Sequence, residues 1–257
     1  MVFWAHKRGT EELQIVSEQS RKDIHNSDIP VVCAACEARH GGVCSTLTPS
    51  QLTELSRHST RRRIDPGSEM VGQGETTNNY ANIIRGVVKL SKMLSDGRQQ
   101  IVGLQFAPDF MGRPFTRESA LSAEAATGID ICAFPRAVVE RLVSEAPGLE
   151  HRLHEQALKE LDEARDWMLT LGRKTAQEKV ASFLYLIATH VDPEHGTATE
   201  FELPLSRADI ADYLGLTIET VSRQITKLRK DGVIRVENSR RMIVPDIDRL
   251  MRLAGMD

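Results

Sequence analysis

The stretch LSRADIADYLGLTIETVSRQITKLRKDGVIRV, near the C-terminal end, carries start and stop signals for two short helices in close succession. Ser206 and Asp209, three residues apart, have the pattern of a capping box, and Thr217 is a natural cap for the second helix. Gly215 lies between the two helices, where a helix commonly ends. These signals predict a helix-turn-helix whose second helix runs from residue 218 to about residue 231.

The second predicted helix has an apolar face. Ile218, Val221, Ile225 and Leu228 fall on that face, and Ala211 is small where the two helices would cross. The other faces carry side chains suited to base edges in a major groove, because arginine binds guanine O6 and N7 and glutamate accepts from a base amino group. The candidate DNA contacts are Thr217, Glu219, Ser222, Arg223 and Lys227.

Basic charge is concentrated around this helix, although the whole chain has a formal net charge of −3. Residues 219–241 contain seven Lys or Arg and three acidic residues, a balance that suits phosphate contacts. The tail VIRVENSRRMIVPD alternates around Asn238-Ser239, which predicts the two strands of a wing. The alternative is a helical hairpin with a solvated basic face.

Residues 61–135 differ from the segments on either side in their sequence pattern. Glycine recurs between short apolar runs such as NIIRGVVKL, QQIVGLQF and GIDICAF, a spacing typical of a β-sandwich or barrel. Within this region Asp96-Gly97 predicts a two-residue hairpin turn. Upstream, TLTPSQLTELSRHST predicts a short helix with Pro49 in its first position, and residues 1–30 read as a polar leader.

A long helical segment is predicted at about residues 136–170, and another helix at 175–190. The charged flanks of the first (KELDEARD) favour an exposed helix that meets one partner, and a second copy of the chain is the simplest partner. The alternative is a helix packed on its own core. The predicted contacts have the spacing of a coiled-coil seam, and they are His154, Ala157, Leu161, Ala164, Met168 and Leu171.

No apolar run in the sequence approaches the roughly eighteen residues needed to cross a bilayer, and the first thirty residues contain no apolar core of signal-peptide length. We therefore expect a cytoplasmic protein with reduced thiols and no membrane partner. Neither a nucleophile–base set nor a phosphate loop is apparent in the sequence, so we predict no enzyme and no catalytic residue.

Three of the four cysteines lie in VVCAACEARHGGVCS, and the fourth follows almost ninety residues later. In a reducing compartment, clustered cysteines favour metal or redox chemistry over disulfides. Standing alone, the cluster favours a zinc site formed by Cys33, Cys36, His40 and Cys44, with Cys132 as an ordinary buried thiol. Reduced or redox-switching thiols are a further alternative.

The chain resembles the CRP/FNR family of bacterial transcription regulators. The resemblance lies in the order of its predicted parts, which are a β-domain with recurring glycines, a long helix and a winged helix-turn-helix. The resemblance covers nearly the whole chain from residue 33 onward, and its most specific part is LGLTIETVSRQITKLRKDGVI. It implies an α+β fold with a leader, a β-roll sensor domain like that of cyclic-nucleotide-binding proteins, a dimerisation helix and a winged helix-turn-helix. The expected bounds of these four parts are residues 1–30, 31–135, 136–171 and 172–257.

The set Glu219, Ser222 and Arg223 resembles the FNR branch of that family. This resemblance implies that a homodimer reads TTGAT-type half-sites, with Arg223 on the guanine and the other two side chains on its neighbours. RNA polymerase is a further partner of family members, and the exposed loops SDGRQQ and VDPEHGTAT are candidate contacts for it.

The same branch implies a cofactor. FNR proteins hold a 4Fe-4S cluster with three cysteines near the N-terminus and one in the β-domain, an arrangement that Cys33, Cys36, Cys44 and Cys132 match. The gap between Cys36 and Cys44 is longer than in the founding enteric protein, and two glycines would let that loop bend. By resemblance, the intact cluster favours the DNA-binding dimer, and oxygen degrades the cluster so that DNA is released.

The other sensors of the family fit less well. Its cyclic-nucleotide binders carry an arginine–hydroxyl pair late in the β-domain, and DFMGRPFTRESALSAEAATG lacks that pair at the expected place, so no cyclic nucleotide is expected. A haem sensor would leave the four cysteines unexplained. A zinc-stabilised regulator of another signal and an iron–sulfur electron carrier stay open as alternatives.

Overall fold

The structure is a computed structural model that describes residues 29–34, 36–191, 199–238 and 240–256 of the 257-residue chain. The chain divides into two compact units, one from Met1–Lys92 and Leu104–Lys159, the other from Met93–Gly103 and Glu160–Asp257. The predicted leader and the candidate polymerase contact VDPEHGTAT lie almost wholly outside the described residues. Across the described ranges, no helix is both long and apolar enough to span a membrane.

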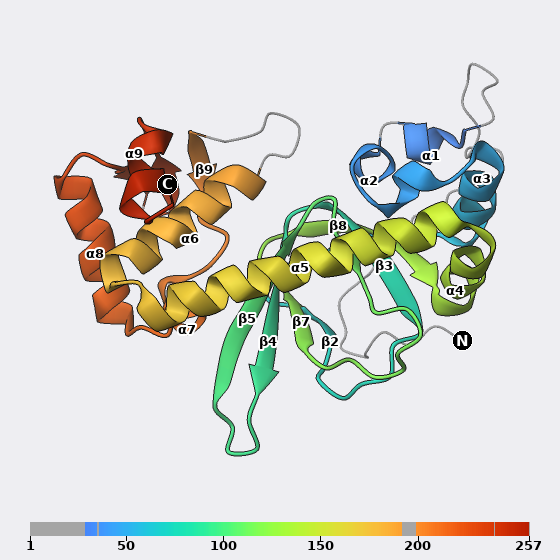
Figure 1. Cartoon of the computed structure of the whole chain (residues 1–257), viewed down its shortest axis with the longest axis horizontal. Coiled ribbons are helices and arrows are strands. Elements are labelled where there is room, and N and C mark those ends of the chain that lie inside the picture. The colour runs from blue at the N-terminus through green and yellow to red at the C-terminus, as the bar shows by residue number, and fades with distance from the viewer. Residues whose placement is uncertain (1–28, 35, 192–198, 239, 257) are drawn as a thin grey trace. The chain divides into compact units, whose positions relative to one another are not determined.

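Two four-stranded sheets form the β-domain (Figure 1), which confirms the prediction for residues 61–135. The first sheet has the order β1 (Thr60–Ile64), β8 (Ile129–Pro135), β3 (Asn79–Arg85) and β6 (Phe110–Met111). The second has the order β2 (Glu69–Val71), β7 (Ser122–Ala125), β4 (Val87–Met93) and β5 (Gln99–Phe106).

Strands β3 and β8 present two different faces, because successive side chains of a strand point to opposite sides. One face joins the core between the two sheets, which includes Ala81, Ile83, Ile129, Ile131 and Ala133 together with Met70 and Val88 of the second sheet. The intervening side chains of β3 and β8 point the other way, and they are Tyr80, Asn82, Cys132 and Phe134.

A layer of short helices covers that second face (Figure 1). Its apolar side chains form a second core with Tyr80 and Phe134, in which Leu52, Leu55 and Leu142 are all buried. Helix α3 begins at Pro49 as predicted. The layer consists of α1 (Val31–Ala34), α2 (Glu37–His40), the 3-10 helix η2 (Val43–Thr46), α3 (Pro49–His58) and α4 (Arg136–Glu145).

The predicted dimerisation segment, residues 136–171, contains two helices, α4 and the 27-residue α5 (Pro147–Arg173). The break falls at Ala146, whose backbone is extended (φ −125°, ψ 90°). The ring of Pro147 disfavours a helical conformation for the residue before it, whereas proline itself fits the first turn of a helix. Helix α5 therefore starts at Pro147.

The second unit contains the predicted helix-turn-helix and wing. Ser206 and Asp209 form a capping box, Gly215 ends the first helix at φ 59°, and Thr217 caps the second. The wing, β10–β11, gains a third strand, β9, which like α9 has no counterpart in the sequence prediction. The elements are α6 (Ala176–His190), β9 (Glu200–Glu202), α7 (Arg207–Leu214), α8 (Ile218–Lys230), β10 (Arg235–Glu237), β11 (Arg241–Ile243) and α9 (Ile247–Leu253).

Two predictions are wrong in detail. Ile218 does not join the apolar face of α8: it is 47% exposed because it opens the helix, where its neighbours Thr217 and Glu219 are exposed as well. The β4–β5 hairpin has three central loop residues instead of two. Its loop is closed by Leu94 N–H donating to Arg98 O at 2.7 Å, and Gly97 takes a φ of 87° within it.

Candidate cysteine site and nucleic-acid interface

Cys132 lies near the middle of the first sheet, on the face that the helical layer covers. Strand β8 pairs with β1 on one side and β3 on the other, and the register places Cys132 directly beside Arg61 and Asn82. Side chains opposite each other on paired strands share a face, so these three form a row across the sheet. Within this row Cys132 is half-buried and Asn82 is only 1% exposed.

The three N-terminal cysteines approach this row from the helical layer. Cys33 belongs to α1 and is half-buried, Cys36 directly precedes α2 and is buried, and Cys44 belongs to η2 and is buried. The structure thus brings all four predicted ligands to one cavity of about 20 Å³. Polar side chains in its wall are Arg39, Ser56, Ser59, Arg61 and Asn82.

The surroundings of the cavity disfavour bare thiolates. Burial raises the pKa of the Cys44 thiol well above its usual range, the neighbouring Cys132 raises it further, and a hydrogen bond from Asn82 lowers it. Burial also raises the pKa of Cys132 to about 12, against the lowering effects of Ser59 and Arg61. Thiolates at Cys44 and Cys132 therefore need a cation to offset their charge, and metal binding supplies one while releasing the protons.

In the part of the chain that the structure describes, the arrangement is not that of a preformed site for a single ion. Among the described residues, no three His, Cys, Asp or Glu side chains are grouped closely enough to hold one metal ion. A zinc ion needs four ligands at about 2.0–2.3 Å, whereas thiolates of an iron–sulfur cluster bind different irons and stand farther apart. His40, the fourth ligand of the zinc alternative, is exposed and is not among the described residues that line the cavity.

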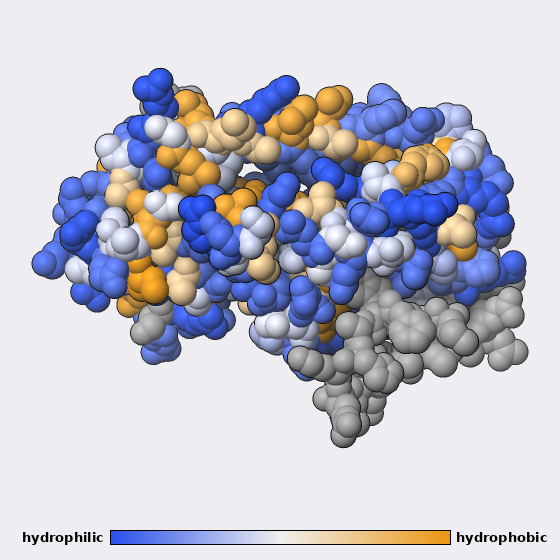
Figure 2. All heavy atoms as spheres, turned by 90° about the horizontal axis from the view of Figure 1, so that it is seen from below, coloured by the Kyte–Doolittle hydropathy of each residue, from blue (hydrophilic) through white to orange (hydrophobic). Residues whose placement is uncertain are grey.

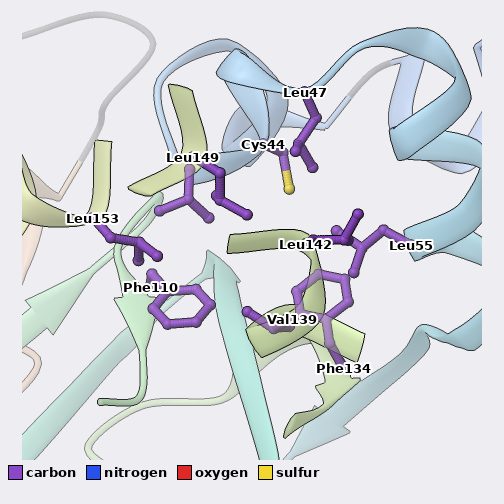
Figure 3. Close-up of a pocket in the computed structure, with 10 residues that line it drawn as sticks. Cys44, Leu47, Leu55, Phe110, Phe134, Val139, Leu142, Leu149 and Leu153 are labelled. Atoms are coloured by element: carbon purple, nitrogen blue, oxygen red, sulfur yellow. The ribbon is translucent and has the colours of Figure 1, made fainter. Parts of the chain in front are cut away.

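A second, apolar cavity of about 10 Å³ adjoins the cysteine cavity and shares Cys44, Leu55 and Phe134 with it. Figure 3 shows the side chains that line it, which come from η2, α3, the sheet and helices α4 and α5. Leu149 and Leu153 are the contribution of α5. An apolar space this small stays dry, so it is a packing contact between the Cys44 segment and α5.

The cysteine loop, residues 41–46 around Cys44, is also hydrogen-bonded to α5. The Arg152 guanidinium donates to the backbone oxygen of Gly41 at 2.6 Å and forms an ion pair with Glu155 at 3.1 Å. Gly148 lies close to Thr46, because a Cβ added at Gly148 would be 3.4 Å from the Cβ of Thr46. The first turns of α5 are therefore fastened to the loop that carries Cys44.

The predicted seam of α5 faces solvent, unlike a helix packed on its own core. Leu161 and Met168 are 45% and 72% exposed, and Leu158 and Leu169 flank them with similar exposure. Figure 2, which shows one face of the molecule coloured by hydropathy, has hydrophobic (orange) and hydrophilic (blue) residues interspersed on that face. Of the six predicted seam residues, His154, Ala157, Leu161, Ala164 and Met168 are exposed and Leu171 is half-buried.

The candidate base-reading residues of α8 lie on its exposed side. Glu219, Ser222 and Arg223 are exposed and, at a spacing of three and four residues, share one face of the helix. Hydrogen bonds from its own backbone N–H and from Thr217 hold the pKa of Glu219 below its usual range. The start of α8 therefore offers an ionised acceptor beside the guanidinium donors of Arg223.

The other two candidates, Thr217 and Lys227, are exposed but have partners within the chain. The Thr217 hydroxyl accepts from Thr220 N–H at 3.2 Å as the cap of α8. Lys227 Nζ donates to Gln177 Oε1 at 2.7 Å, which joins α8 to α6. Both side chains position the helix in addition to any contact with DNA.

Two domain families match the chain: the Crp-like helix-turn-helix domain at residues 178–253 and the cyclic nucleotide-binding domain at residues 61–146. A "probable transcriptional activator" of Rhizobium leguminosarum bv. viciae is 63% identical over 91% of this chain and 98% of its own length. The chain belongs to the CRP/FNR family of transcription regulators. Members of this family are DNA-binding regulators and not enzymes, which confirms the prediction of no catalysis.

Further similarities support this place in the CRP/FNR family. The transcriptional activator protein FnrL of Cereibacter sphaeroides is 40% identical over 90% of this chain and 96% of its own. The solved structure of FixK2 from Bradyrhizobium japonicum matches with a TM-score of 0.69 and 33% identity, over 76% of this chain and 96% of that chain. The predicted α+β architecture of β-domain, long helix and C-terminal helix-turn-helix is thereby confirmed.

The sequence prediction missed the polar side chains in the cavity wall, among them Arg61 and Asn82, and also Arg152, which contacts the nearby Gly41. Asn82 carried a local signal, because it interrupts the apolar run YANII and a polar residue in a buried strand calls for a reason. Arg61 and Arg152 carried none, since their partners come from distant segments.

Proposed function

We propose that this CRP/FNR regulator is an oxygen-responsive transcription activator. As a homodimer it binds TTGAT-type palindromes while a 4Fe-4S cluster on Cys33, Cys36, Cys44 and Cys132 is intact, and it releases DNA after the cluster is lost to oxygen. The observation that carries this proposal is the convergence of all four cysteines of the chain on one cavity. The similarity to FnrL, named as a transcriptional activator, supports the same branch of the family.

The four cysteines come from two parts of the chain. Cys33, Cys36 and Cys44 belong to the helical layer and Cys132 to β8. When bound, the cluster supplies an oxygen-labile bridge between these parts. The loop that carries Cys44 is fastened to α5 through Arg152, so the position of the loop biases how the start of α5 packs.

The exposed seam of α5 pairs with the same seam of a second copy. It consists of His154, Ala157, Leu161, Ala164, Met168 and Leu171, and its two alanines make it weaker than an all-leucine seam. A weak dimer responds to small energies, because about 1.4 kcal/mol changes its affinity tenfold. The helical layer can therefore control dimerisation with a modest change in packing.

In the dimer, the two copies of α8 enter successive major grooves of a palindrome. Arg223 contacts the guanine of each half-site and Glu219 and Ser222 its neighbours, with Thr217 and Lys227 at the edge of the interface. We expect the protein in the cytoplasm, where it meets DNA and RNA polymerase. The exposed loop SDGRQQ of the β4–β5 hairpin is the candidate polymerase contact within the described residues.

The first test is the visible spectrum, with iron and sulfide content, of protein purified without oxygen and then exposed to air. We expect a brown sample with about four irons per chain that bleaches in air, because a cluster with four thiolate ligands absorbs in the visible range. Cys132→Ala should abolish the colour. His40→Ala is the matched control and should leave the spectrum unchanged.

A colourless sample with one zinc per chain, lost in His40→Ala, would contradict the cluster and support the zinc alternative. The proposed DNA binding is tested separately. The salt dependence of binding is measured for a TTGAT palindrome and for a scrambled sequence of the same composition. An electron carrier would bind both sequences alike, whereas the proposed regulator prefers the palindrome.

A further inference from the structure

Asn82 is a buried polar side chain beside the cysteine cavity. It is 1% exposed, lies directly across from Cys132 in the β3–β8 register, and forms part of the cavity wall. Its Nδ2 donates to Cys44 Sγ at 3.2 Å, and its Oδ1 has no hydrogen-bond partner among the described residues. One amide thus touches the sulfur of one proposed ligand and neighbours another.

The fold itself gives no reason for an amide at this position. Most buried polar side-chain atoms have at least one hydrogen-bond partner, but within the described part of the chain the Oδ1 of this amide has none. A neutral thiol is only a weak acceptor, whereas a thiolate accepts an N–H strongly. The acceptor here is the Cys44 sulfur at 3.2 Å, so this contact would strengthen once that sulfur is bound to a metal.

We propose that Asn82 is a positioning residue for Cys44 as an iron–sulfur ligand and that it slows the loss of the cluster in oxygen. This inference rests on the proposed function. The amide N–H holds the Cys44 sulfur toward the cavity and withdraws electron density from it. Hydrogen bonds to cluster sulfurs raise the reduction potential, which makes oxidation of the bound cluster less favourable.

Two substitutions separate the donor from the shape of the side chain. Asn82→Leu removes both polar atoms at a similar volume, and Asn82→Asp keeps the shape while replacing the N–H donor with an acceptor. The matched control is Ile83→Val, on the same strand but facing the core between the sheets. Each protein is purified without oxygen, its iron, sulfide and visible spectrum are measured, and the decay of the visible band is followed in air-saturated buffer.

We expect Asn82→Leu to assemble the cluster with an altered visible band and to lose it roughly ten times faster in air, the lower end of typical outer-shell effects. Asn82→Asp should lose the cluster at least as fast as Asn82→Leu does, because a carboxylate repels the neighbouring thiolates. Ile83→Val should lower the thermal unfolding temperature of the cluster-free protein, yet keep the parent spectrum and decay rate.

Parent-like spectra and decay rates in both Asn82 variants would overturn the inference while leaving the proposed function intact. Thermal unfolding of the cluster-free protein shows whether Asn82→Leu folds. If it does not, the inference is tested by Asn82→Asp alone, and a parent-like decay rate in that variant would overturn it. A parent protein that binds no cluster would overturn the proposed function, and the inference with it.

Discussion

Trp167, in the last turns of α5, stacks on Tyr213 of α7 with ring centroids 4.3 Å apart and nearly parallel planes. Phe183 of α6 completes the cluster edge-on, 6.0 Å from the Tyr213 ring. Stacked and edge-to-face aromatic pairs stabilise beyond the area they bury. At the scale of single residues, this cluster joins the end of α5 to the helix that precedes α8.

Replacing Trp167 with Ala should destabilise the second unit. We expect a loss of about 2–3 kcal/mol, somewhat below the usual cost of removing a large core aromatic, because Trp167 is only half-buried. Urea unfolding of the cluster-free protein, followed by circular dichroism, measures this loss.

Trp167→Phe is the control and should retain most of the stability, because a phenyl ring still stacks on Tyr213. If Trp167→Ala unfolds at the same urea concentration as the parent, the stack does not stabilise the unit. DNA affinity should fall together with stability in Trp167→Ala. Trp167 supports α7, and α8 packs against α7.

Residues differ in how much of their role the sequence could predict. The four cysteines stood out because thiols are rare in the chain and three of them are close together. The roles of Asn82 and Arg152 could not be predicted, since they depend on the β3–β8 register and on a contact across 111 positions. Local spacing carries no information on such pairs.

At the scale of elements, the fastening of α5 to the cysteine loop is the contact with the clearest functional consequence. Arg152→Ala removes the hydrogen bond to Gly41 but leaves the apolar contact made by Leu149 and Leu153. We expect this variant to bind the cluster as the parent does, and to dimerise several-fold more weakly when loaded, on the order of 1 kcal/mol.

Sedimentation under nitrogen measures that change, with the iron content of each sample as a check on loading. Lys159→Ala is the matched control, because it removes one exposed positive charge from α5 away from the loop. Equal dimerisation of Arg152→Ala and the parent would show that the hydrogen bond from Arg152 to Gly41 does not control dimerisation.

The elements themselves were predictable wherever their ends carry chemical signals. The capped helices α3, α7 and α8 were found through Thr, Ser, Pro and Gly at their boundaries, and the wing through the alternation around Asn238-Ser239. Strand β9 was missed because it has only three residues and exists through pairing with β11, about forty positions away. Strands β10 and β11 are equally short, but they pair with each other across a local turn, so their pattern is visible in the sequence.

At the scale of the whole molecule, a dimer with two recognition helices requires a fixed spacing of half-sites. We expect anaerobic protein to bind a palindrome with half-site centres about 10 base pairs apart more tightly than a single half-site. Five extra base pairs between the half-sites should remove this gain, because the second site then faces the opposite side of the duplex. Fluorescence anisotropy with labelled DNA measures each affinity.

A single half-site of the same length is the control for that series. If the five-pair insertion binds as tightly as the intact palindrome, the protein does not engage both half-sites with one dimer. The spacing is a property of the assembled molecule, and no residue or helix considered alone contains it.

The separation of the cysteines along the chain also bears on how the protein is made. Cys33, Cys36 and Cys44 leave the ribosome early, while Cys132 follows almost ninety residues later, on strand β8 between β1 and β3. A nascent chain therefore presents at most three of the four proposed ligands. If these four cysteines are the ligands, a complete ligand set exists only after the β-domain has been translated.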